Sequence, residues 1–165
     1  MKVRIPGRQR ILNPLARPTI RTMLFRCAAQ VMIEVFEFGG SGDKLRRLED
    51  AVRARLDCYE KNYGTARQIL DAMVADARKM GIEYIVRPGS GEKVLVGLEH
   101  DMVYLAYMME LRVHEGIKFG QVRLDRFSDE LARRIRYYNR TFDGAPEMVI
   151  PVMQERLAAY GKTDL

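Results

Sequence analysis

Eight consecutive residues decide the fold, because every position in Met102-Val-Tyr-Leu-Ala-Tyr-Met-Met109 is apolar or aromatic. The run lies inside a segment from Leu98 to Glu115 that has the length of a helix and is closed by Gly116. A helix that is apolar on all sides is usually buried. We therefore predict an all-α fold of about six helices, in which the helix over residues 98–115 is central and the others pack around it.

The other helices are predicted by the spacing of apolar residues in the rest of the chain. Steps of three and four residues place side chains on one helical face. Such stripes cover residues 19–38, 41–63, 65–80 and 120–140. A last helix should begin near Pro151, because proline is tolerated in a first turn, and end at Gly161. Ser41 is the expected cap of the second helix, and Gly81 is the expected C-terminal cap of the third.

Residues 82–96 allow two interpretations. Ile82–Arg87 is short and rich in β-branched residues, a turn sequence follows, and Lys93–Val96 suits the return strand of a small β-hairpin. The same four residues suit the first turn of the next helix equally well, with Ser90 as its cap. We favour a short hairpin or an extended loop at this place.

The positive charge of the chain is concentrated near its N-terminus. The net charge is +6, yet residues 1–26 contain seven basic residues and no acidic one, so the rest of the chain is nearly neutral at −1. Pro6, Pro14 and Pro18 disfavour helix. We predict a basic extended arm over residues 1–18 and a single helical domain over residues 19–165. The arm suits nucleic acid or an acidic protein surface, and it equally suits solubility alone.

The composition excludes several classes of protein. Hydrophobic residues make up 47% of the chain and charged residues 30%, a balance typical of globular proteins. No uncharged apolar run approaches the roughly 20 residues that span a bilayer, and the N-terminal stretch lacks the apolar region of a signal peptide. We expect a cytoplasmic protein of a bacterial host, without membrane contact. Cys27 and Cys58 fit reduced thiols, and both are expected on the apolar faces of their helices.

No motif for catalysis or cofactor binding emerges. The two Gly-Ser-Gly loops, at Gly40 and Gly89, lack the spacing of a phosphate-binding loop, and there is no Gly-x-Ser-x-Gly nucleophile motif. Glu110 and His114 share a helical face, but two ligands do not make a metal site. The acid–base and metal candidates considered are Glu99, His100, Asp101, Glu110, His114 and Glu115. We predict no catalytic residue, no metal and no cofactor.

The helix predicted over residues 120–140 carries the most suggestive surface. Arg126, Arg133, Tyr137 and Arg140 lie within about 60° of one another around the helix, and Arg123 borders them. Arginine interleaved with tyrosine is typical of surfaces that bind nucleic acid or acidic partners. The alternative is a solvated face in which Glu130 pairs with its arginine neighbours. The predicted binding residues are Lys2, Arg4, Arg8, Arg10, Arg17, Arg123, Arg126, Arg133, Tyr137 and Arg140.

One stretch resembles a motif of small helical proteins from bacteriophages and prophages of Firmicutes. These proteins have a helix that ends near a histidine, a Phe-Gly element, and Arg-Leu-x-Arg-Phe at the start of an amphipathic helix. The matching residues are His114, Phe119, Gly120, Arg123, Leu124, Arg126 and Phe127. The family doubles the Phe-Gly element, whereas this chain has Ile117-Lys118 at the first pair. The resemblance covers residues 98–162 and implies a phage context; it assigns no activity.

Three hypotheses of function follow from the sequence. The first is a non-enzymatic, phage-type protein that binds nucleic acid or a host nucleoprotein machine; inhibition of a host defence nuclease, in the manner of an anti-CRISPR protein, is one concrete form. The second is a homo-oligomeric assembly protein with a solubilising arm. The third and weakest is a small hydrolase with a carboxylate–histidine site on the helix over residues 98–115.

Overall fold

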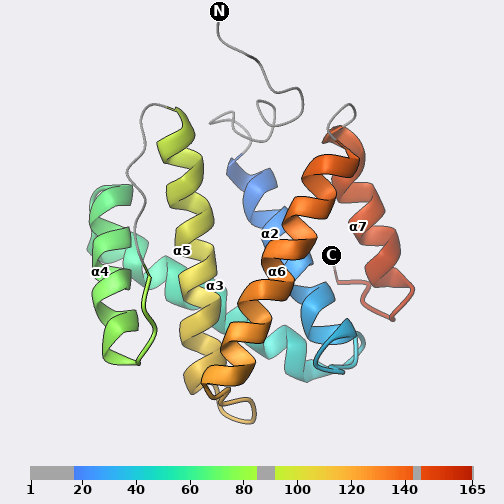
Figure 1. Ribbon diagram of the computed structural model, residues 1–165, viewed down its shortest axis with the longest axis horizontal. Coiled ribbons are helices and arrows are strands. Elements are labelled where there is room, and N and C mark those ends of the chain that lie inside the picture. The colour runs from blue at the N-terminus through green and yellow to red at the C-terminus, as the bar shows by residue number, and fades with distance from the viewer. Residues whose placement is uncertain (1–16, 85–91, 143–145, 165) are drawn as a thin grey trace, which may run out of the picture. The chain divides into compact units, whose positions relative to one another are not determined.

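The computed structural model describes residues 17–84, 92–142 and 146–164, and every regular element in these ranges is helical (Figure 1). The prediction of an all-α fold is confirmed. The α-helices are α2 (Arg17–Glu34), α3 (Asp43–Asn62), α4 (Ala66–Lys79), α5 (Glu92–Val113), α6 (Gln121–Thr141) and α7 (Val149–Ala158), and the 3-10 helix η2 (Pro146–Met148) precedes α7. None of the helices described is long and apolar enough to cross a membrane.

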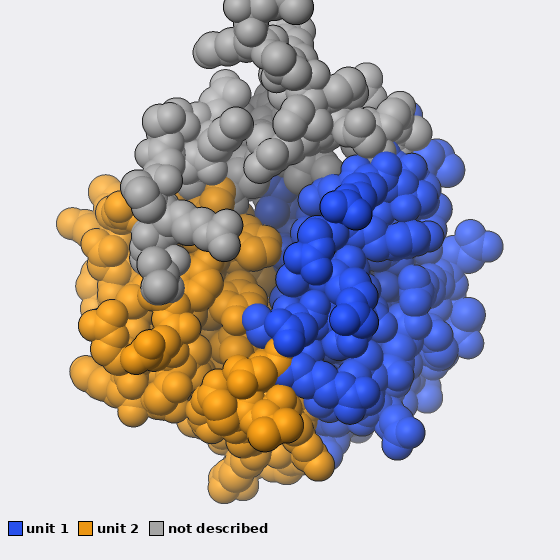
Figure 2. Space-filling model, in the orientation of Figure 1, with its two compact units in different colours: residues 1–45, 126–165 blue, residues 46–125 orange. Residues whose placement is uncertain are grey.

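The chain forms two compact units, which Figure 2 distinguishes by colour. Unit 1 comprises residues 1–45 and 126–165, and unit 2 comprises residues 46–125. In unit 1, α2 packs against α7, and most of α6 belongs to the same unit. In unit 2, α4 packs against α5.

The apolar run Met102–Met109 lies in α5, within unit 2. Seven of the eight residues from Met102 to Met109 are buried, and only Tyr104 is partly exposed. However, α5 begins at Glu92, six residues before the predicted start.

The predicted return strand of the hairpin is therefore wrong, because Lys93–Val96 belongs to the first turns of α5. Adding residues to an existing long helix is cooperative, and this outweighs the local β-propensity of the valines. Ile82–Tyr84 forms no strand, and residues 85–91 lie outside the described part of the chain.

The ends of the other helices follow from local backbone chemistry. Thr65 caps α4 by accepting a hydrogen bond from the Gln68 backbone N–H, and the Gln68 side-chain oxygen accepts one from the Thr65 backbone N–H. Gly81 follows α4 with a φ of 77°, the left-handed conformation that favours glycine, which confirms its predicted role. By contrast, α3 begins at Asp43, two residues after its predicted cap Ser41.

Two other predicted boundaries shift by a few residues. The α2 helix ends at Glu34, before the predicted end at Phe38, and Glu37 adopts a positive φ of 60°. The α7 helix begins at Val149, so that Pro151 lies in its first turn, where proline is tolerated.

The two cysteines occupy opposite environments. Cys27 on α2 is completely buried, as predicted, and burial raises the pKa of its thiol to about 12, while Arg134 and Arg156 act in the opposite direction. Cys58 is exposed, so its predicted place on an apolar face is wrong. It follows the buried Leu56 by two residues, a rotation of about 200° around α3 that points it away from the core.

This difference predicts two different responses to substitution. Cys27→Ala should lower the free energy of unfolding by about 1 kcal/mol, because it leaves a cavity among buried side chains. Cys58→Ala should change it by less than about 0.5 kcal/mol, as at an ordinary surface position. Urea unfolding followed by circular dichroism measures both. A thiol reagent should label Cys58 in the folded protein and Cys27 only after unfolding; equal labelling rates would contradict the assignment.

Candidate nucleic-acid interface on helix α6

The rotation of α6 within unit 1 is set by Tyr138. This side chain is 1% exposed, and its hydroxyl accepts a hydrogen bond of 2.7 Å from the side-chain nitrogen Nε2 of Gln30 on α2, which is itself completely buried. Burial raises the pKa of the Tyr138 hydroxyl above its ordinary range. The Tyr138 ring also stacks on Phe142, with ring centroids 6.1 Å apart. The Tyr138 side of α6 is therefore fixed against α2.

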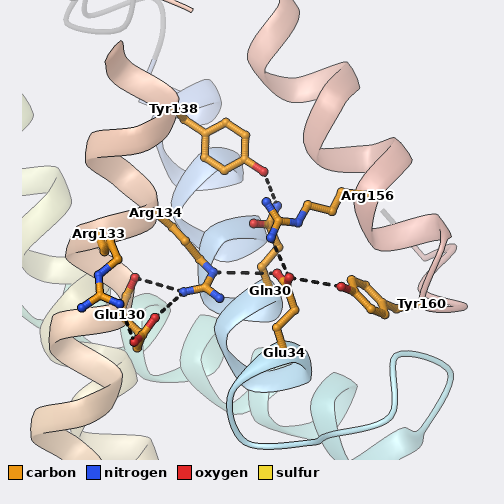
Figure 3. A network of polar contacts seen from close by, with 8 residues as sticks. All are labelled: Gln30, Glu34, Glu130, Arg133, Arg134, Tyr138, Arg156 and Tyr160. Carbon is orange, nitrogen blue, oxygen red and sulfur yellow. Dashed lines mark hydrogen bonds and ion pairs between the residues drawn. The ribbon is translucent and has the colours of Figure 1, made fainter. Parts of the chain in front are cut away.

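A second polar group, centred on Glu34, joins three helices of unit 1 (Figure 3). Arg156 on α7 donates to Glu34 Oε2 over 2.6 Å, and the Tyr160 hydroxyl donates to the same oxygen over 3.1 Å. Arg134 on α6 places its Nε atom 3.8 Å from Glu34 Oε1. The Glu34 carboxylate thus lies between two guanidinium groups, at a site where the Glu34 and Arg134 side chains are each 15% exposed.

Glu130 forms the outer part of the same network. Its Oε2 atom accepts from Arg134 over 2.7 Å, and its Oε1 atom accepts from Arg133 over 3.0 Å. The hydrogen bond from Arg134, aided by the charge of Arg133, lowers the pKa of the Glu130 carboxyl. The stability that ionised Glu130 gains from its arginine partners is therefore fully present above the unfolded pKa of about 4.3. It is lost as the pH falls through the lower pKa of the folded state.

The opposite face of α6 brings four predicted binding residues together. Arg126 is exposed, with its guanidinium 5.7 Å from the centroid of the Phe36 ring. The Arg133 side chain is 69% exposed despite its bond to Glu130, and Tyr137 is 52% exposed. Arg140 is also exposed and forms no ion pair among the residues that the structure describes. The predicted stripe is therefore a continuous outward face of α6 in unit 1.

The remaining predicted residues lie elsewhere. Arg123 belongs to unit 2, where its guanidinium lies 5.6 Å from the centroid of the Phe119 ring. Arg17 is the first residue of α2, so it belongs to a helix and not to the predicted extended arm. Lys2, Arg4, Arg8 and Arg10 lie outside the described residues, and their role remains a prediction.

The predicted histidine and carboxylate candidates contact side chains of unit 2. Glu110 accepts from Arg55 over 2.7 Å and lies 3.4 Å from the ring nitrogen Nδ1 of His114, so the predicted shared face is confirmed. His100 lies 3.2 Å from Asp101, which also accepts from Tyr84. Across the described ranges, no three His, Cys, Asp or Glu side chains gather closely enough to hold a metal ion.

The inner network is the feature that the sequence reasoning missed. Gln30, Glu34, Arg156 and Tyr160 were not singled out, although two signals were available. Gln30 and Glu34 follow Cys27 by three and seven residues, which puts polar groups on a buried helical face. Glu34 is also the first acidic residue of the chain. Arg136 and Asn139 are further exposed polar residues of α6 beside the stripe.

Comparison with protein families, with curated proteins and with solved structures finds no match to this chain. The interpretation of the α6 surface therefore rests on its own geometry and charge.

The Glu34 network predicts that one conservative substitution lowers the free energy of unfolding substantially. Glu34→Gln keeps the size of the side chain but removes its charge, leaving Arg156 without its carboxylate and Arg134 with Glu130 alone. The free energy of unfolding should fall by about 2 kcal/mol, in the range for hydrogen bonds to charged groups. Asp50→Asn is the matched control, because Asp50 pairs with Arg53 at an exposed site and such pairs contribute at most about 1 kcal/mol. If urea unfolding gave the same loss of stability for Glu34→Gln and Asp50→Asn, the network would contribute no more than an exposed ion pair.

Proposed function

We propose that this chain is a non-enzymatic, phage-type protein that binds nucleic acid through the outward face of α6. The observation that carries the proposal is the exposed stripe of Arg126, Arg133, Tyr137 and Arg140 on one side of a single helix. From Leu131 to Arg140, the helix has four arginines and no acidic residue. Guanidinium groups match the geometry of phosphate oxygens, which they can bind with two parallel hydrogen bonds.

The ion pairs on the outward face of α6 neutralise only part of its positive charge. Both oxygens of Glu130 already accept from arginines, and one of these, Arg134, is turned toward the interior network. Among the described residues, Arg126 and Arg140 form no direct ion pair, and Arg126 acts on Glu130 only through its charge. The surface therefore offers fixed positive charges to an anion, and a nucleic-acid backbone supplies anions in a regular row.

The N-terminal arm and the family resemblance support the same proposal. Lys2, Arg4, Arg8 and Arg10 add positive charge that suits phosphate contacts. The Phe119 to Phe127 motif supports a phage context, in which a nucleic-acid-binding protein acts inside the bacterial host. Binding to the protein part of a host nucleoprotein machine, such as a defence nuclease, is the alternative that the experiments below separate.

Removing the stripe charges should weaken nucleic-acid binding and its dependence on salt. In the triple variant Arg126→Gln, Arg133→Gln and Arg140→Gln, up to three phosphate contacts are lost. The slope of log K against log salt should then decrease by about 2 for a single strand and about 3 for duplex DNA. Glutamine is nearly as good a helix former as arginine, so α6 should persist. Fluorescence anisotropy with a labelled oligonucleotide between 50 and 200 mM salt measures the slope.

The matched control removes the same charge from unit 2. Arg67→Gln, Arg78→Gln and Lys79→Gln change three exposed basic residues of α4. If both triple variants lose the same affinity, binding follows net charge and the α6 site is wrong. If the wild-type chain binds no nucleic acid, the proposal fails; light-scattering mass and affinity capture from nuclease-treated host extract then distinguish a homo-oligomer from a protein-bound complex.

The arm is tested by a separate set of substitutions. Changing Lys2, Arg4, Arg8 and Arg10 together to glutamine should reduce the salt slope by up to about 3 to 4 for duplex DNA, because each lost contact contributes about 0.9. The circular dichroism spectrum should be unchanged. An unchanged slope would mean that the arm serves solubility alone.

A further inference from the structure

We infer that Tyr137 is a base-stacking residue, so that the α6 stripe binds single-stranded nucleic acid in preference to duplex. This inference rests on the proposed function and specifies its ligand. Tyr137 lies between two arginines of the stripe, one helical turn after Arg133 and just under one turn before Arg140. Aromatic rings set among basic residues are the usual means by which proteins hold unpaired bases.

The Tyr137 ring rests on its neighbour Tyr138. It packs against Tyr138 in a T-shaped arrangement, with centroids 5.2 Å apart and an interplanar angle of 74°. In such an arrangement the edge of one ring meets the face of the other, so at least one face of Tyr137 remains free of Tyr138. Because Tyr138 is itself fixed by Gln30 and Phe142, the Tyr137 ring has a rigid support.

About half of the Tyr137 residue is open to solvent. Tyr137 is 52% exposed, and its hydroxyl forms no hydrogen bond to any residue that the structure describes. Replacing the ring should therefore cost the fold little. A loss of binding in a Tyr137 variant would then report on the ligand and not on unfolding.

The geometry of the stripe favours a single strand over a duplex. Arg126, Arg133 and Arg140 repeat every seven residues, which places them about 10 Å apart in a nearly straight row along α6. A flexible single strand can follow such a row and turn one base toward the ring between the cations. In a duplex the bases are stacked inside and paired, and their faces are not available to a surface tyrosine.

The test compares three tyrosine variants on two ligands. The variants are Tyr137→Ala, Tyr137→Phe and the control Tyr63→Ala, which removes an exposed tyrosine from unit 2. Each is titrated against a labelled 20-nucleotide single strand and the matching duplex at one salt concentration. Wild type should bind the single strand more tightly. Tyr137→Ala should lose about 5- to 150-fold in single-strand affinity, the effect of one base–aromatic stack. Its duplex affinity should not change. Tyr137→Phe and Tyr63→Ala should match wild type.

The outcomes separate this inference from the proposed function. If the arginine triple variant lowers affinity but Tyr137→Ala binds the single strand as wild type does, the surface binds nucleic acid and the stacking inference is overturned. Tighter binding of duplex than of single strand, or an equal loss in Tyr137→Phe and Tyr137→Ala, also overturns it. If no nucleic acid binds, the proposed function fails, and this inference fails with it. Circular dichroism of each variant verifies the fold.

Discussion

The burial of the Tyr138 hydroxyl is the constraint on which the arrangement of unit 1 depends. A buried hydroxyl without a partner costs about 1–3 kcal/mol, and Gln30 removes that cost with one hydrogen bond of 2.7 Å. The bond fixes which side of α6 faces α2, and Phe127 and Leu131 are buried together with Tyr138. The arginine stripe lies on the other side of the same helix, where Arg126, Arg133 and Arg140 are exposed.

The neighbouring residues Arg133 and Arg134 illustrate how one helix serves two purposes. They differ by about 100° in direction around α6, so Arg134 reaches the carboxylate of Glu34 while Arg133 remains mostly exposed. Glu130 binds both. A buried pair of charges contributes little net stability, but removing one partner is costly. The Glu34 network therefore acts chiefly to hold α2, α6 and α7 in one register.

The sequence could predict whatever depends on neighbours along the chain. The apolar spacing identified the helices, and Gly81 was recognised as a terminator because its conformation is local. The Glu34 network could not be predicted, since its bond to Arg156 joins residues 122 positions apart. Two other predictions failed because apolar spacing alone does not fix the exact direction of one side chain or the exact start of one helix. Cys58 lies beside its apolar stripe and not on it, and the valines before Gly97 extend α5 although their local preference is for strand.

The sequence left a binding face and a solvated, ion-paired face as alternatives for α6, and the distances bear on that choice. An ion-paired face needs enough acids for its arginines, but Glu130 already contacts two of them. Arg126 and Arg140 lie about 10 Å from Arg133 along the helix, which is close to the screening length at physiological salt. Their mutual repulsion therefore costs the free protein little. A row of arginines that Glu130 neutralises only in part can persist at small cost to stability. A phosphate backbone that approaches within the screening length interacts with all of these arginines at once.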